Sequence, residues 1–163
     1  MGSLHVISAS FRKKYYVNIL LVEDDYLLGR STARLIEKAG QHKVRLTRKV
    51  SDIFKHCQSG QIDLVVMDVN LPGTIWQGKE VTGIELSRLL KQQSKTARLP
   101  IVLLTANFAD VSCAQLVSEA LADGIYTKPI ADANEFLTLL DQIKQNQEGA
   151  SDDGFQEITA SAS

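Results

Sequence analysis

The sequence has few cysteines, few prolines and no long apolar run. Its 163 residues include two cysteines, Cys57 and Cys113, which favour free thiols in a reducing compartment because they form neither a disulfide framework nor a zinc-site spacing. No apolar stretch approaches the ~20 residues that a membrane helix needs. The N-terminus also lacks the continuous apolar core of a signal peptide. We therefore expect a cytoplasmic protein with no insertion into a membrane.

An excess of charge of either sign is also missing. The chain has 18 Lys and Arg residues against 19 Asp and Glu residues, so its formal net charge is -1. A nucleic-acid-binding domain usually carries a basic excess, and the composition therefore disfavours direct nucleic-acid binding. We interpret the one local basic stretch as a solvated face. It contains Lys38, Lys43, Arg45, Arg48 and Lys49.

Four short apolar runs, each ending at polar residues, are the main structural signal. Short apolar runs separated by amphipathic stretches predict buried parallel strands with helical crossovers. A more polar strand over 44–47 is expected at a sheet edge. Together these predict an α/β fold, a doubly wound five-stranded parallel sheet with helices on both faces. The four runs are Ile19–Val22 before Glu23, Leu64–Met67 before Asp68, Ile101–Leu104 before Thr105, and Ile125–Thr127 before Lys128.

Amphipathic segments between these runs predict the helices. Asp24 or Asp25 can cap the first helix, which should stop at Gly40. Thr82 and Glu85 match a capping box at the start of another. Further helices are expected over 51–59, 82–93, 111–121 and 131–145. We expect one domain over 15–146, an N-terminal extension over 1–14, and a disordered acidic tail over 147–163, where four acids occur without a basic residue.

The acidic residues after two of the strands predict a metal site. The carboxyl ends of parallel strands share one sheet edge, where ligands bind in open α/β sheets. Glu23, Asp24 and Asp68 should therefore converge there. Neighbouring carboxylates repel one another unless a cation is present, and Mg²⁺ prefers carboxylates, waters and a phosphoryl oxygen. We expect Mg²⁺ at this edge, with Mn²⁺ as a substitute; helix capping explains Asp25 alone.

The same edge contains a candidate phosphoryl acceptor. A carboxylate such as Asp68 can accept a phosphoryl group as an acyl phosphate, with a metal ion neutralising the charge. Lys128 would supply a positive charge to that group, and the Lys128-Pro129 bond can be cis. Each signal is weak alone. The ordered set at the ends of four strands is specific.

These motifs resemble the receiver domain of two-component response regulators, over roughly residues 16–146. The resemblance implies a flavodoxin-like fold with strand order 2-1-3-4-5. It also implies phosphorylation of Asp68 by a histidine kinase or a phosphotransfer protein. The matching pieces are Leu20–Asp25, Val66–Pro72, Leu103–Ala106 and Tyr126–Pro129.

The resemblance further implies the ligands of the metal. Asp24 and Asp68 would bind Mg²⁺ directly, together with the backbone carbonyl of Asn70. Glu23 would act through a water molecule.

The resemblance also implies a switch. Lys128 would pair with the phosphoryl group, and Thr105 would move to hydrogen-bond it and reshape the surface of the fourth and fifth strands. With Ile125, Tyr126 and Pro129 these residues form the candidate switch region. The segment after residue 146 is too short and too polar for a DNA-binding module. We therefore expect either that the signal passes to a downstream protein partner or that this receiver is one domain of a hybrid kinase or a larger regulator. Homodimerisation through the switch surface stays open.

Two features depart from the family pattern. The family usually carries an aromatic residue three places before the lysine, where this chain has Ile125; Tyr126 comes next and should point to the opposite face of the sheet. The loop over Val69–Val81 is about twice the family's usual length. It should either cover the phosphorylation site, contact the kinase, or be a neutral insertion.

Three other functions compete with a phosphorylated receiver. A phosphohydrolase usually needs a second acid two places after its nucleophile, where this chain has Asn70, so only self-phosphorylation and autodephosphorylation at Asp68 are expected. A flavin- or nucleotide-binding module would need a glycine loop where the acids stand. The alternative we keep is a degenerate receiver, a protein-interaction module that works without phosphorylation; the full acidic set argues against it and Ile125 argues for it.

Overall fold

A five-stranded parallel sheet forms the middle layer of the molecule. The computed structural model describes residues 16–106 and 112–152. The strand order β2-β1-β3-β6-β7 is the predicted doubly wound order, with β6 and β7 as the fourth and fifth strands of the sheet. The strands are β1 (Asn18–Val22), β2 (Lys43–Thr47), β3 (Leu64–Asp68), β6 (Ile101–Thr105) and β7 (Gly124–Thr127).

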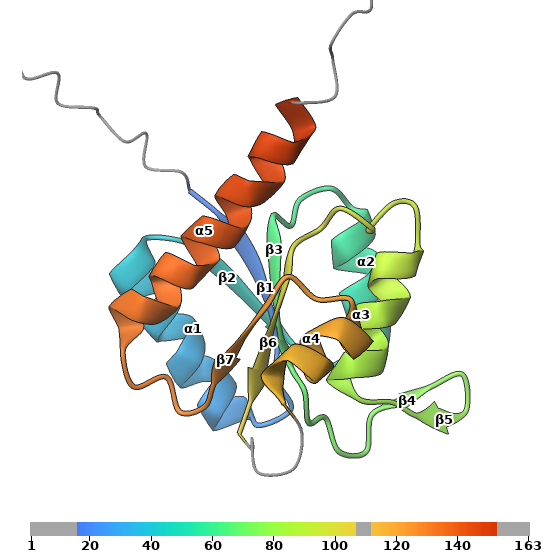
Figure 1. The fold of residues 1–163 in the computed structure, drawn as a ribbon. Helices are drawn as coiled ribbons and strands as arrows, with labels where there is room; N and C mark the ends of the chain where they lie inside the picture. The colour runs from blue at the N-terminus through green and yellow to red at the C-terminus, as the bar shows by residue number, and fades with distance from the viewer. Residues whose placement is uncertain (1–15, 107–111, 153–163) are drawn as a thin grey trace, which may run out of the picture.

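Helices cover both faces of this sheet (Figure 1). The residues that pack on each face form two separate apolar clusters, which alternate along every central strand. One face is covered by α1 (Tyr26–Gly40) and α5 (Ala133–Asp152), the other by α2 (Val50–Gln58), α3 (Gly83–Gln92) and α4 (Cys113–Ala120).

The strands differ in burial as their positions require. Every residue of β3 and β6 is buried, because helices cover both faces of the central strands. Strand β2 alternates between exposed and half-buried residues, which confirms the predicted edge strand.

Both cysteines are free thiols, as expected.

The register of the strands brings their carboxyl ends level. Val22 pairs with Met67, Asp68 with Leu104, and Thr105 with Thr127. The residues that follow β1, β3, β6 and β7 therefore meet at one edge of the sheet, although they come from distant parts of the chain.

The long segment after β3 contains a hairpin that the sequence analysis treated as a loop. Strands β4 (Ile75–Trp76) and β5 (Lys79–Glu80) pair antiparallel and project from the body of the molecule (Figure 1). The two turn residues, Gln77 and Gly78, have φ values of 49° and 77°, as a two-residue type I′ turn requires. The pattern was missed because each strand has only two residues.

The last helix is longer than predicted. It continues to Asp152, so the predicted end at Gln145 is wrong, and residues 147–152 are helical where the sequence analysis expected a disordered tail. Its last buried apolar residue is Ile143, and Lys144 pairs with Glu148 one turn later at 3.8 Å. Gln147 also donates from Nε2 to Oδ1 of Asp123 at 3.1 Å, so local pairs and one tertiary hydrogen bond, rather than apolar burial, sustain the end of the helix. The predicted N-terminal extension and the rest of the tail lie outside the described residues.

Within the residues that the structure describes, no helix combines the length and the apolar character needed to cross a bilayer.

Candidate phosphorylation site

Asp68 lies at the centre of the carboxyl-end edge, as the last residue of β3. It is 2% exposed, and both its carboxylate oxygens are hydrogen-bonded. Its Oδ2 accepts a hydrogen bond from Lys128 Nζ at 2.6 Å, and its Oδ1 accepts one from the backbone N–H of Asn70 at 3.0 Å. The carboxylate is therefore held in one orientation by groups from two loops.

Lys128 joins Asp68 to a second buried acid. Its Nζ also lies 3.0 Å from Oε2 of Glu23, which is 5% exposed and follows β1. Burial alone would lower the pKa of Lys128, but the hydrogen bonds and charges of Asp68 and Glu23 outweigh it and raise the pKa above its ordinary 10.5. The ammonium therefore stays charged where a phosphoryl group would need it.

Asp24 completes an acidic cluster at this edge. Glu23, Asp24 and Asp68 each offer a carboxylate oxygen, and these oxygens all lie within 4.8 Å of one another. Burial raises the pKa of Asp24, and the neighbouring Glu23 carboxylate raises it further. Three carboxylates against one ammonium leave two uncompensated negative charges. The donor set and this charge both fit a hard divalent cation.

Asp25 has a different role from its neighbours. Its Oδ1 accepts a hydrogen bond from the backbone N–H of Leu28 at 2.9 Å and caps α1. Its backbone N–H donates to Oε1 of Glu23 at 3.1 Å. The prediction that this acid is a helix cap is confirmed.

Thr105 and Pro129 lie beside Lys128. Thr105 is 5% exposed at the end of β6, and its carbonyl accepts a hydrogen bond from the backbone N–H of Lys128 at 2.8 Å. The peptide bond between Lys128 and Pro129 is cis. The structure thus brings the ammonium of Lys128 to the predicted acids and joins its backbone to that of Thr105.

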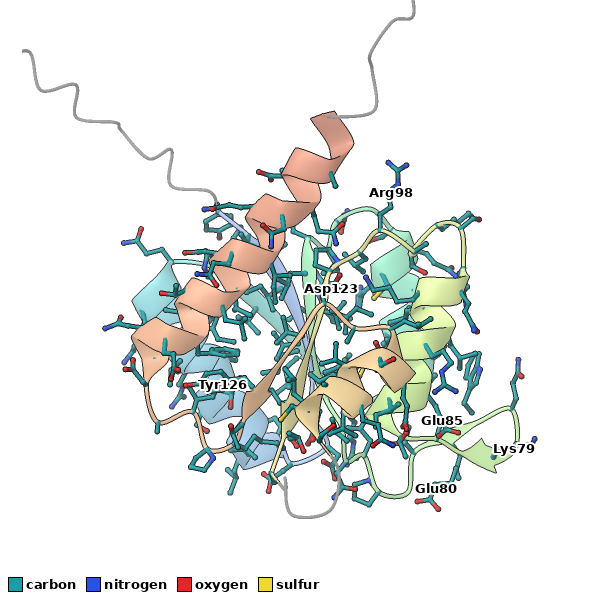
Figure 2. All side chains as sticks on the ribbon, viewed as in Figure 1. Lys79, Glu80, Glu85, Arg98, Asp123 and Tyr126 are labelled. Atoms are coloured by element: carbon teal, nitrogen blue, oxygen red, sulfur yellow. The ribbon has the colours of Figure 1, made fainter. Side chains whose placement is uncertain are left out.

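Ile125 and Tyr126 face opposite sides of the sheet, as predicted. Ile125 packs against the cluster under α2, α3 and α4. Tyr126 lies on the α5 side (Figure 2), with its ring centroid 5.1 Å from that of Phe136 and its hydroxyl 2.8 Å from Glu135 Oε2. The aromatic ring is thus held by α5, away from the side of the sheet where Ile125 packs.

Gly83 is a site residue that the sequence analysis did not identify. It lies between Thr82 and Glu85 of the predicted capping box, which the structure confirms. Its backbone N–H donates to the carbonyl of Val69 at 3.0 Å, and a Cβ at this position would collide with the carbonyl oxygen of Asp68. The start of α3 therefore packs directly against the backbone of the phosphoacceptor candidate, a contact with no sequence signature.

The family model of the response regulator receiver domain matches residues 19–143. The chain belongs to this family. Receiver domains are signalling modules of two-component systems rather than enzymes with external substrates, and they bind Mg²⁺ at an acidic pocket. In this receiver, Glu23, Asp24 and Asp68 form an acidic cluster that could hold a metal ion.

Two relatives agree with this membership. The receiver is 34% identical over 90 residues to the swarming motility regulation protein RssB of Serratia marcescens, covering 55% of this chain and 36% of that protein. It is 27% identical over 114 residues to the polar-differentiation response regulator DivK of Brucella anthropi, covering 70% of this chain and 85% of that one. The chain thus spans about a third of RssB and most of DivK.

Solved structures share the fold. A putative response regulator from Chloroflexus aurantiacus matches with a TM-score of 0.67 and 25% identity, covering 80% of this chain and 99% of that chain. A CheY-like receiver domain protein from Methanospirillum hungatei matches with a TM-score of 0.66 and 20% identity, covering 83% and 99%.

Proposed function

We propose that this receiver is a phosphorylation switch that accepts a phosphoryl group on Asp68 from a histidine kinase or a phosphotransfer protein and signals through contacts with a downstream protein. The observation that carries the proposal is the contact of Lys128 Nζ with Asp68 Oδ2, inside a cluster of three acids. A lysine that only offset surface charge would not lie 2.6 Å from a carboxylate that is 2% exposed.

In the proposed transfer, an Asp68 carboxylate oxygen attacks the phosphorus of a phosphohistidine. The phosphohistidine reacts with its other ring nitrogen protonated. The new P–O bond forms as the P–N bond breaks, the bonding electron pair stays on the ring nitrogen, and the imidazole leaves as the neutral ring that keeps this proton. Lys128 holds the carboxylate in place beforehand and offers its positive charge to the phosphoryl oxygens. Because Lys128 is already in position, the site needs no reorganisation when charge develops on the phosphoryl oxygens.

The residues present fit a bound Mg²⁺. The carboxylates of Asp24 and Asp68 and the backbone carbonyl of Asn70 would hold it, with Glu23 acting through water. When bound, the ion would neutralise carboxylate charge and draw electron density from a phosphoryl oxygen. The two uncompensated negative charges of the cluster support this assignment.

The phosphorylated state would act through Thr105 and the surface of β6 and β7. The Thr105 hydroxyl would hydrogen-bond the phosphoryl group and alter the packing around Ile125, which lies on the same face of the sheet. Because Tyr126 is held on the opposite face, its rotation does not enter this mechanism. The switch would therefore depend on aliphatic packing under α4 rather than on an aromatic ring.

Intact-mass spectrometry with phosphoramidate and Mg²⁺ tests the proposal. The native chain should gain one phosphoryl group, whereas Asp68→Asn and a metal-free sample should gain none. Asp25→Asn is the matched control, because it removes a neighbouring acid outside the cluster and should be labelled normally. Labelling of Asp68→Asn, or equal labelling without metal, would refute the assignment. An absence of both labelling and calorimetric Mg²⁺ binding would favour a degenerate receiver that acts by contacts alone.

A further inference from the structure

Exposed apolar side chains gather on both sides of the acidic cluster. The described residues include six large apolar side chains that are exposed, and four of them lie at this edge of the molecule. Three begin α1, where Tyr26 is 66% and Leu27 78% exposed, and the fourth is Ile75 on the β4–β5 hairpin, 59% exposed. Apolar surface concentrated around a reactive group is typical of a protein-binding site. The six are Tyr16, Tyr26, Leu27, Leu28, Ile75 and Leu121.

The hairpin presents Ile75 from a fixed position. The ring of Trp76, the next residue, packs against Phe54 of α2 with centroids 4.9 Å apart. The base of the hairpin is closed by a bond from the N–H of Val81 to the carbonyl of Thr74 at 2.8 Å, and by the N–H of Gly73 donating to Glu80 Oε1 at 2.9 Å. Since neighbouring strand residues point to opposite sides, anchoring Trp76 inward directs Ile75 outward.

A cavity of about 610 Å³ lies between this hairpin and the start of α2. Asp24 of the acidic cluster forms part of its wall, and Pro72 to Trp76 form another part. Arg48 and Lys49 line the same cavity. Arg48 also lines a neighbouring cavity of about 380 Å³ with Glu23, Asp24 and Tyr26. The hairpin, the basic pair and the acidic cluster thus form one continuous surface.

The basic pair has no partner within the described part of the chain. Arg48 and Lys49 are exposed, and neither side chain makes an ion pair or a hydrogen bond there. By contrast, Lys91 and Lys128 each hold a carboxylate within 3.0 Å. Two free cations beside an outward apolar side chain match a partner surface that carries carboxylates around an apolar side chain.

We propose that the β4–β5 hairpin and the Arg48-Lys49 pair form a docking surface for the protein that donates the phosphoryl group. The partner would place an apolar side chain against Ile75 and carboxylates against Arg48 and Lys49. This inference rests on the proposed function, because a phosphohistidine that reaches Asp68 must bring its own protein over this edge. A small phosphodonor has no apolar part that would need Ile75.

Phosphotransfer assays with two kinds of donor test the proposal. Phosphoramidate serves as the small donor, and the protein donors are the purified, prephosphorylated histidine kinases and phosphotransfer domains of the source organism, of which the fastest is used. The variants are Ile75→Glu and Arg48→Glu. The controls, Tyr16→Glu and Arg98→Glu, likewise replace an exposed apolar and an exposed basic residue by glutamate. Both lie before the amino ends of strands, and Figure 2 shows Arg98 far from Lys79 and Glu80 of the hairpin.

Both hairpin-side variants should lower kcat/KM for the protein donor by about tenfold, mainly through KM, and leave the phosphoramidate rate within twofold. The controls should match the native chain, and Arg48→Lys should restore transfer. Three results would overturn the docking proposal alone. They are a loss of kcat/KM below twofold in both variants, an equal loss with the protein donor and with phosphoramidate, and a native chain that phosphoramidate labels but no protein donor does. A native chain labelled by no donor would refute the proposed function, and the docking proposal with it.

Discussion

Replacing Asp24 by Asn should stabilise the metal-free protein while abolishing its response to Mg²⁺. Asp24 has no lysine or arginine within ion-pair distance among the described residues, whereas Glu23 and Asp68 share Lys128. The substitution preserves the shape of the side chain and removes one of the two uncompensated charges. A residue that binds metal but destabilises the empty site should behave in this way.

The magnitude follows from the geometry. Glu23, Asp68 and Lys128 together carry one net negative charge, and the carboxylate oxygens lie within 4.8 Å. Coulomb's law gives a repulsion of about 1 kcal/mol at the dielectric constant of water and about 3 kcal/mol at an effective value of 20. Because Asp24 is only partly buried, solvent screening favours the lower figure. About 1 kcal/mol corresponds to a rise of about 3 °C in Tm for a domain of this size.

Thermal unfolding in EDTA and in Mg²⁺ measures both effects. At a Mg²⁺ concentration of about ten times Kd, linkage should stabilise the native chain by about 1.4 kcal/mol, whereas Asp24→Asn should gain nothing. The raised pKa of Asp24 adds a pH test. In the metal-free native chain, the contribution of this group to stability should be fully present below its ordinary pKa of 3.8 and be lost as pH rises through the raised value.

Asp25→Asn is the control, because it removes the same charge from the next residue and keeps a good helix cap. It should retain the full Mg²⁺ response. The reasoning fails if Asp24→Asn lowers Tm in EDTA, or if it still gains stability from Mg²⁺.

Three further substitutions test other parts of the site. Gly83→Ala should lower the free energy of unfolding, measured in urea, by about 2 kcal/mol, because the added methyl group would collide with the backbone of Asp68. The control Gly149→Ala, where the added methyl group meets open space on α5, should not lower it. Equal losses of stability in the two variants would contradict the close contact of Gly83 with Asp68. Lys128→Met should lower the free energy of unfolding by about 3 kcal/mol at pH 7, because it leaves Glu23 and Asp68 without their ion-pair partner. The difference in stability between the native chain and this variant should narrow as pH rises above 10.5 through the raised pKa of Lys128, because the native ion pair is then lost. A difference that does not change with pH would contradict this reasoning. Trp76→Ala should release the hairpin from Phe54 and make tryptic cleavage after Lys79 several-fold faster, with Tm unchanged. An unchanged cleavage rate would show that the ring contact does not hold the hairpin.

The sheet and the acidic edge could be predicted from the sequence because both depend on strong local signals. Four apolar runs define the central strands, and parallel topology alone then places Glu23, Asp24, Asp68 and Lys128 at one edge. The opposite orientations of Ile125 and Tyr126 follow from strand alternation in the same way.

The features that were missed depend on contacts or on weak local patterns. The hairpin strands have two residues each and are stabilised by Trp76 against Phe54, which lies 22 positions earlier in the chain. The close approach of Gly83 to Asp68 is a tertiary contact that no spacing reveals. The extension of α5 beyond Ile143 has no apolar periodicity to mark it, so the boundary was placed too early.

The bridge made by Lys128 has a consequence for the order of events during synthesis. Its ammonium contacts Glu23 and Asp68, which precede it by 105 and 60 positions. While the ribosome is still making β7, the strands that carry these acids have already emerged, and their carboxylates have no counter-charge. Because a domain generally folds as a unit, the acidic edge should stay open until the last strand and helix have been made. A nascent chain that stops before residue 128 should therefore remain sensitive to protease at the loops after β1 and β3.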